Sequence, residues 1–63
     1  MRNNIKKYRQ TMGLTQAELA EISGVSRTVI AQLESGVREN VTAETMLKIS
    51  KALEKSVEEI FLL

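Results

Sequence analysis

The sequence contains no cysteine, histidine, proline or tryptophan, and no aspartate. Without cysteine, a disulfide, a thiolate nucleophile and a zinc–thiolate site are excluded. Without histidine, the chain lacks the most frequent general base and the most frequent metal ligand. The three glycines are dispersed, so no glycine-rich phosphate loop is present. We therefore expect no enzymatic activity, no metal, no cofactor and no small-molecule ligand.

Long hydrophobic runs are also missing. The longest apolar stretch covers only residues 60–63, whereas a membrane-spanning helix needs about 20 residues. No apolar segment follows the first residues, as it would in a signal peptide. We therefore expect a cytoplasmic protein without a membrane partner. The chain has 63 residues, 43% hydrophobic and 27% charged, which fits one globular domain over residues 1–63.

Positive charge is concentrated near the N-terminus, although the formal net charge is only +1. Residues 1–17 contain basic side chains and no acidic one, whereas residues 18–40 and 41–63 each contain more acidic than basic side chains. A basic region of this kind favours a nucleic acid partner. A solvated helix face accounts for the same charges equally well.

Glycines and capping residues divide the chain into five predicted helices. Each glycine follows an amphipathic run, where helices commonly end in a left-handed residue. A hydroxyl residue precedes each of the later runs: Thr15, Ser26, Thr42 and Ser56. Thr15 and Ser56 each have a glutamate three residues on, which is the pattern of a capping box. No stretch alternates with the period of a strand, so the predicted fold class is all-α. The predicted helices cover residues 3–12, 16–23, 27–35, 43–54 and 57–61.

Apolar residues recur at helical spacing within these segments, so each helix has one face to bury. Isolated helices of this length are marginal, and they must therefore pack together. The predicted core consists of Ile5, Tyr8, Met12, Leu19, Ala20, Val29, Ile30, Leu33, Met46, Ile49, Leu53, Val57, Ile60 and Phe61.

The second and third predicted helices are joined by the short connection 23–26, which contains one glycine. Two short helices around such a turn are typical of a helix-turn-helix, although other small helical proteins contain similar corners. Five residues of the third helix share an outer arc of about 140°. These residues are Arg27, Thr28, Ala31, Gln32 and Ser35. Guanidinium, hydroxyl, methyl and carboxamide groups are those that read base edges in a major groove, and an ordinary exposed helix face would also carry them.

Three segments of this region resemble the lambda-repressor/Cro-type helix-turn-helix family, also called the XRE family. They are residues 14–20 (LTQAELA), 23–30 (SGVSRTVI) and 32–36 (QLESG). Residues 42–53 (TAETMLKISKAL) and 56–61 (SVEEIF) resemble the fourth and fifth helices of that family. The resemblance implies a compact five-helix lambda-repressor-like domain and a prokaryotic or phage regulator that binds double-stranded DNA.

The same resemblance implies a role for each matching position. Base contacts, or contacts to the phosphates beside them, would come from Arg27, Thr28, Ala31 and Gln32. Backbone phosphates would be held by Gln16, Ser35, Arg38 and Asn40. Gln16 would also brace the start of the third helix. Glu39 lies beside Arg38 and opposes phosphate binding at that loop.

Arg9 falls on the apolar face of the first predicted helix, near Ile5 and Met12. A charge in that position needs a partner. The resemblance implies that Arg9 pairs with Glu34, at the edge of the core face of the third helix. We interpret both residues as structural.

The sequence departs from the family pattern at three positions. Glu54 replaces a common glycine, so the fourth helix is expected to end differently. Lys55 replaces an apolar residue, and Val41 replaces a common proline. The third helix carries a single cation, Arg27, so most electrostatic affinity for DNA would come from flanking positions.

The family usually binds palindromic DNA as a two-fold dimer. Because the 63 residues contain no separate dimerisation segment, the interface would come from the domain itself. The candidates are Leu47, Phe61, Leu62 and Leu63, although the terminal residues could instead complete the monomer core. The favoured function is therefore a transcriptional repressor. The alternative is a protein-interaction module, such as an antitoxin or a coactivator, with the same fold.

Overall fold

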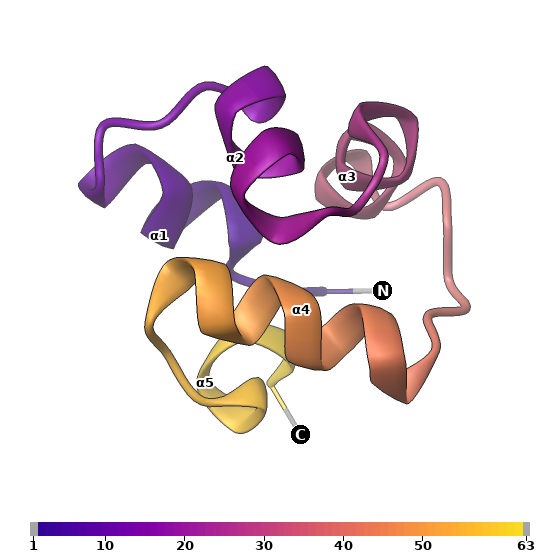
Figure 1. Ribbon diagram of the computed structural model, residues 1–63. Coiled ribbons are helices and arrows are strands. Elements are labelled where there is room, and N and C mark those ends of the chain that lie inside the picture. The colour runs from indigo at the N-terminus through magenta and orange to yellow at the C-terminus, as the bar shows by residue number, and fades with distance from the viewer. Residues whose placement is uncertain (1, 63) are drawn as a thin grey trace.

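Residues 2–62 are described by the structure, a computed structural model. They form five α-helices and no strand, which confirms the predicted fold class (Figure 1). The helices are α1 (Ile5–Thr11), α2 (Gln16–Ser23), α3 (Arg27–Ser35), α4 (Ala43–Leu53) and α5 (Val57–Phe61). The bounds of α2, α3 and α5 are those predicted from the capping residues.

Each of the last four helices begins after a hydroxyl side chain that accepts a hydrogen bond from a backbone amide of the first turn. These side chains are Thr15, Ser26, Thr42 and Ser56. Thr15 and Ser56 form complete capping boxes with Glu18 and Glu59, whose carboxylates accept from the cap amides. Because these bonds satisfy amides that have no partner inside the helix, local sequence alone sets where the four helices start.

The first helix is shorter than predicted because two asparagines before it are used in tertiary contacts. The side-chain amide of Asn3 donates to the Leu33 carbonyl at 2.9 Å. Asn4 donates from its backbone amide to the Ile60 carbonyl and from its side chain to the Glu59 carbonyl. The N-terminal segment therefore links the ends of α3 and α5, and the helix begins only at Ile5.

The fourth helix ends one residue earlier than predicted, because Glu54 adopts the left-handed conformation with φ 56°. A left-handed residue other than glycine costs about 1–2 kcal/mol. The usual helix-end bonds are nevertheless kept: Lys55 donates its backbone amide to the Ser50 carbonyl at 3.2 Å. Glu54, at the position where the resembled family commonly has glycine, thus adopts the left-handed conformation that glycine favours.

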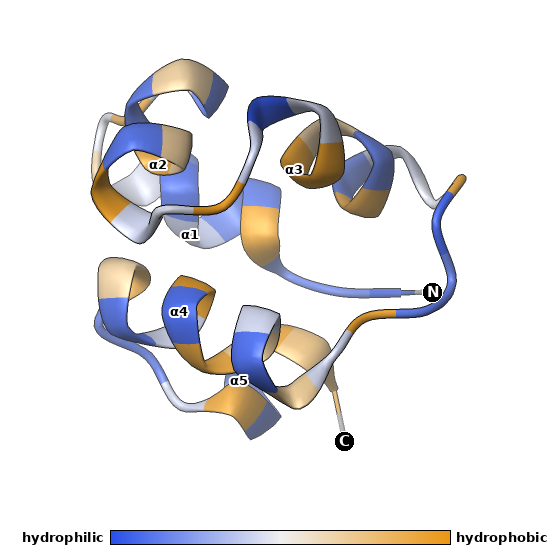
Figure 2. Cartoon of the chain, turned by 45° about the vertical axis from the view of Figure 1, so that its right-hand side comes forward, coloured by the Kyte–Doolittle hydropathy of each residue, from blue (hydrophilic) through white to orange (hydrophobic). Residues whose placement is uncertain are grey.

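Within residues 2–62, the core contains nine buried hydrophobic residues, drawn from all five helices and the turn between α2 and α3. They are Ile5, Leu19, Val25, Ile30, Leu33, Ile49, Leu53, Ile60 and Phe61. Figure 2 shows the resulting alternation of hydrophobic and hydrophilic patches along the helices. Several predicted core residues only pack against this cluster, half-buried: Tyr8, Ala20, Val29, Met46 and Val57.

Two corrections to the predicted core follow from the ends of helices. Met12 is 41% exposed and lies one residue beyond the end of α1. Val25, which was not predicted, is buried because the turn places it between α2 and α3. Among residues 2–62, α3 contacts α2 and α1 on its inner side. On its other side, Arg27, Thr28 and Ser35 are exposed.

Candidate nucleic-acid interface

The turn between α2 and α3 is fixed by one left-handed glycine and one buried valine. Gly24 has φ 76°, which an L side chain rarely adopts. Val25 follows with 7% exposure, and its backbone amide donates to the Ser23 hydroxyl at 3.2 Å. Ser26 then caps α3. The predicted helix-turn-helix is therefore formed, and its buried valine holds the start of α3 against the core.

The two faces of α3 differ sharply in chemistry. Ile30 and Leu33 are fully buried. The opposite face contains the predicted base-reading residues: Arg27 and Thr28 are exposed, and Ala31 and Gln32 are half-buried. The acidic residue of the helix, Glu34, is turned away from this face into an ion pair. The outer face is consequently polar and free of acidic side chains. The small side chain of Ala31 leaves room for a ligand to approach the helix closely.

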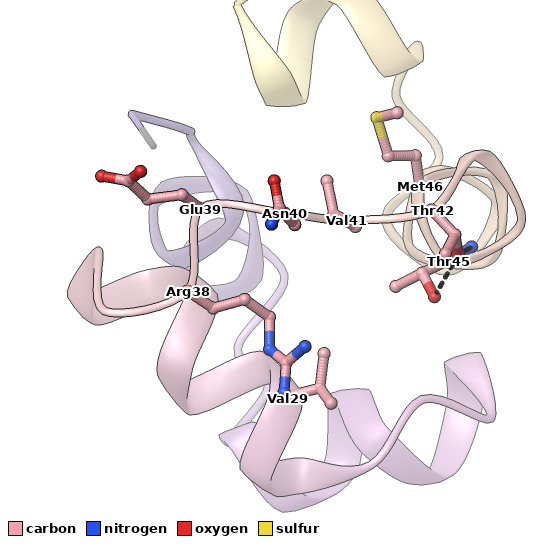
Figure 3. A pocket seen from close by; sticks show the side chains of 8 residues that line it. All are labelled: Val29, Arg38, Glu39, Asn40, Val41, Thr42, Thr45 and Met46. Atoms are coloured by element: carbon pink, nitrogen blue, oxygen red, sulfur yellow. Dashed lines mark hydrogen bonds between the residues drawn. The ribbon is translucent and has the colours of Figure 1, made fainter.

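The loop after α3 returns along the helix and brings Arg38 to Gln32. The backbone amide of Arg38 donates to the Gln32 carbonyl at 3.2 Å. Its Nε donates to the Gln32 side-chain oxygen at 2.9 Å. Figure 3 shows the Arg38 guanidinium next to Val29, while the Glu39 carboxylate points away from it. The positive charge of Arg38 is thus attached to the outer face of α3, and Glu39 does not neutralise it.

A shallow groove of about 460 Å³ lies beside this arginine, between α3 and the start of α4. Its lining residues are Val29, Arg38, Glu39, Asn40, Val41, Thr42, Thr45 and Met46 (Figure 3). Asn40 is exposed at its rim, next to the N-terminus of α4. Ser35, another predicted phosphate contact, is exposed at the end of α3 and donates its hydroxyl hydrogen to the Gln32 carbonyl.

Gln16 is the first residue of α2, as predicted, but it does not brace the start of α3. Its side-chain amide donates to the Glu34 carboxylate at 3.2 Å, so it braces the end of α3 instead. The contact joins residues that are 18 positions apart, and only the packing of α2 against α3 brings them together. No pattern in the sequence indicates it.

Arg9 and Glu34 form the ion pair that the resemblance implied. The Arg9 Nε donates to one carboxylate oxygen of Glu34 at 2.8 Å, and a terminal nitrogen donates to the other at 3.0 Å. The second terminal nitrogen donates to the Leu14 carbonyl at 2.7 Å. The two side chains are only 10% and 5% exposed. The pair therefore connects α1, the segment before α2, and α3.

The ionisation of this pair follows from its contacts. Burial acts to raise the pKa of Glu34, but hydrogen bonds from Arg9 and Gln16 and the charges of Arg9 and Lys6 lower it below its usual value. The hydrogen bond to Glu34 raises the pKa of Arg9. Both groups are charged at neutral pH. Arg9 is neutralised by its partner, so it adds little to the positive surface near the N-terminus.

Comparison with known proteins identifies the family. The Helix-turn-helix family model matches residues 5–60. The chain belongs to the helix-turn-helix family, in its lambda-repressor/Cro (XRE) class. This helix-turn-helix protein is 46% identical over 54 residues to the control protein C.SmaI of Serratia marcescens, covering 86% of this chain and 63% of the relative.

Two further similarities extend over most of this helix-turn-helix protein. An uncharacterised HTH-type transcriptional regulator of Methanothermobacter thermautotrophicus is 42% identical over 64 residues, covering all of this chain and 91% of that protein. The crystal structure of the restriction-modification controller protein C.AhdI from Aeromonas hydrophila has a TM-score of 0.82 and 34% identity, covering 89% of this chain and 83% of that one. The relatives are thus regulators and controller proteins.

The candidate dimer residues differ in their exposure to solvent. Leu47 is 54% exposed on α4, and Leu62 is 50% exposed after α5. Phe61, which was predicted both as a core residue and as a dimer candidate, is 3% exposed and belongs to the monomer core. Leu63 lies outside the described residues.

Within residues 2–62 of this helix-turn-helix protein, every helix is too short or too polar to cross a membrane.

Proposed function

We propose that this helix-turn-helix protein is a transcriptional repressor that binds double-stranded DNA by placing α3 in the major groove. The observation that carries the proposal is the outer face of α3, which is polar, free of acidic side chains and exposed at Arg27, Thr28 and Ser35. A protein-interaction face would instead be expected to expose large apolar anchors. The names of the relatives, regulators and controller proteins, support a regulatory role.

In this arrangement, the first residues of α3 contact base edges, as in other helix-turn-helix proteins. Arg27 presents a guanidinium suited to guanine, Thr28 a hydroxyl and a methyl, and Gln32 an amide. Ala31 lets the helix approach the bases closely. Ser35 and Arg38 contact backbone phosphates from the other end of the same face. Phosphate contacts set the register, while base contacts select the sequence.

Asn40 and the first turn of α4 extend the phosphate contacts along the groove beside Arg38. Gln16 adds a contact from the start of α2, where the helix dipole and the first-turn backbone amides that the capping box does not use favour an anion. These groups lie on neutral or weakly basic segments, so we expect the affinity for unrelated DNA to be modest and to fall steeply with salt.

We further propose that the protein binds a palindromic operator as a homodimer, through Leu47 and Leu62. Both leucines are about half exposed, and apolar side chains of this kind are covered when the copies associate. In sedimentation experiments at tens of micromolar, we expect the wild type to be dimeric and Leu47→Gln/Leu62→Gln to be monomeric. Ile22→Gln is the matched control, because Ile22 is 58% exposed but lies on α2. This substitution should leave the dimer intact. A monomeric wild type that also forms no dimeric DNA complex contradicts the proposal.

Selection from a random duplex library at near-physiological salt tests the proposed function. We expect the wild type to enrich a palindromic consensus, with half-sites about 34 Å apart. Thr28→Ala/Gln32→Ala should relax or abolish that consensus, because it removes two base-reading side chains from the outer face of α3. Gln10→Ala/Thr11→Ala removes the same side-chain types from exposed positions on α1 and should keep the wild-type consensus.

Two outcomes of the selection would contradict DNA recognition by α3. If the wild type enriches no sequence even at reduced salt, DNA recognition by α3 is wrong. The protein-interaction module then becomes the better interpretation. If the α1 control loses the consensus while Thr28→Ala/Gln32→Ala keeps it, the recognition surface has been assigned to the wrong helix.

A further inference from the structure

The groove between α3 and the start of α4 combines apolar side chains with the Arg38 guanidinium (Figure 3). Its volume of about 460 Å³ falls within the range of small-molecule sites, about 300–1,000 Å³. Three apolar side chains line it, and each packs against the core but is only half-buried: Val29, Val41 and Met46. A ligand in the groove would therefore cover apolar surface that the fold leaves in contact with water.

The Arg38 side chain is already held in place at the edge of this groove. Its Nε donates to the Gln32 side-chain oxygen at 2.9 Å, and its backbone amide donates to the Gln32 carbonyl at 3.2 Å. Within residues 2–62, no hydrogen bond or ion pair uses its two terminal nitrogens. A ligand that binds these nitrogens therefore meets a side chain that is already positioned, which lowers the entropic cost of association.

The chemistry of the remaining donors selects a carboxylate. The two terminal nitrogens of a guanidinium form a planar fork that matches the two oxygens of a carboxylate. The Thr45 hydroxyl accepts from the Thr42 hydroxyl at 3.0 Å, so its own hydrogen remains available as a second donor in the groove. The Glu39 carboxylate points away from Arg38 and does not occupy the fork (Figure 3). Donors beside an apolar wall fit an anion that has an apolar body.

We propose that the groove binds a small organic carboxylate. Its charged end lies on the terminal nitrogens of Arg38, and its compact apolar body lies against Val29, Val41 and Met46. Composition and local pattern do not predict this site, because the lining residues come from α3, from the loop after it and from α4, and only the fold brings them together.

Occupancy of the groove would regulate DNA binding. Arg38 and Asn40 are proposed phosphate contacts, and both line the groove. A carboxylate bound to Arg38 takes the place of a backbone phosphate, so the ligand and the operator compete for the same guanidinium. The carboxylate would thus weaken the hold of the repressor on DNA. This regulatory step rests on the proposed function, whereas binding of the carboxylate does not depend on it.

The first measurement is an NMR titration of the full chain with benzoate and with hexanoate, which place an aromatic ring or a flexible chain behind the carboxylate. Both should shift the backbone amide resonances of the groove residues saturably, with dissociation constants of about 1 mM for ligands of this size. Benzamide is the neutral analogue of benzoate, and acetate lacks the apolar body. Each of these two should bind about tenfold more weakly than benzoate.

Variants of Arg38 test the assigned contact. Arg38→Met keeps the length of the side chain and removes its donors, so it should weaken benzoate binding by about tenfold. Arg38→Lys keeps the charge without the fork and should recover only part of that loss. Arg27→Met is the matched control, because Arg27 is an exposed guanidinium that does not line the groove. It should bind benzoate like the wild type. Arg38 and Arg27 are both exposed, so the melting temperatures of the three variants should match that of the wild type.

The second measurement is binding to the selected operator in the presence of benzoate. An equal concentration of acetate is the reference, since it matches the ionic strength that itself weakens DNA binding. At about ten times its dissociation constant, benzoate should weaken operator binding by about fivefold relative to acetate. The operator affinity of Arg38→Met should not respond to benzoate, because the shared guanidinium is gone.

Four results decide against parts of this inference. If neither benzoate nor hexanoate shifts the groove resonances at about 20 mM, far above the expected dissociation constant, the groove is not a carboxylate site. If benzamide binds as tightly as benzoate, or Arg38→Met binds benzoate like the wild type, the assigned contact with Arg38 is wrong. If benzoate binds but leaves the operator affinity unchanged, the competition is wrong. A wild type that binds benzoate and no DNA would contradict the proposed function and the regulatory step, and it would support the carboxylate site.

Discussion

Replacing Arg9 with alanine should lower the free energy of unfolding by about 3–5 kcal/mol. In the wild type, the Glu34 side chain is only 5% exposed, so the substitution deprives a buried carboxylate of its guanidinium partner. It also removes the donor to the Leu14 carbonyl. A core of this size rarely supplies more than about 3–5 kcal/mol of stability in total. We therefore expect Arg9→Ala to be largely unfolded at room temperature, as measured by circular dichroism during thermal and urea unfolding.

A double substitution distinguishes a stranded charge from a simple loss of packing. In Arg9→Met/Glu34→Met, both charges are replaced by flexible apolar side chains of similar length. Replacing a buried ion pair in this way is often neutral or stabilising, so the double variant should recover most of the stability that Arg9→Ala loses. A melting temperature of Arg9→Ala close to that of the wild type would contradict the structural role of the pair.

Acidification provides an independent check on the same pair. Because the pKa of Glu34 is lower in the folded protein than in the unfolded chain, its ionisation stabilises the fold above the unfolded-state pKa of about 4.3. That contribution is lost as pH falls from this value through the lower pKa of the folded state. The wild type should consequently lose more stability than the double variant between neutral pH and pH values below about 4.

The parts of the fold that local chemistry determines could be predicted from the sequence. Thr15 and Ser56, each with a glutamate three residues on, mark helix starts because the groups that satisfy one another are neighbours in the chain. The start of α1 could not be predicted in this way. It depends on Asn3 and Asn4, which bind carbonyls 30 and 55 residues away, respectively.

The same distinction applies to the candidate site. Helical periodicity was sufficient to assign the outer face of α3, because a face is a local property of one helix. The partners of Gln16 and Arg38 depend on how α2 and the loop after α3 fold back. Helical periodicity therefore cannot predict these contacts. Phe61 was predicted both as core and as interface, because its apolar side chain fits either, and only the packing of α5 assigns it to the core.

Replacing Arg27 with alanine should weaken operator binding by about 10- to 100-fold at a fixed salt concentration. Arg27 is exposed at the first position of α3 and is the only cation in that helix. The N-terminal residues of such a helix contact base edges, and a bidentate arginine–guanine contact contributes about 1–3 kcal/mol of discrimination. Isothermal titration with the selected operator and with one changed at the guanine facing Arg27 measures both the affinity and the discrimination.

The variant Arg27→Lys decides which kind of contact Arg27 makes. Lysine keeps the charge but lacks the planar fork, so a phosphate contact would survive the change and a bidentate base contact would not. We expect Arg27→Lys to lose most of the discrimination at that guanine while retaining the salt dependence of the wild type. Arg27→Ala should give the same loss of discrimination. An equal weakening of all sequences, with the salt slope reduced by about one, would instead make Arg27 a phosphate contact and leave base reading to Thr28 and Gln32.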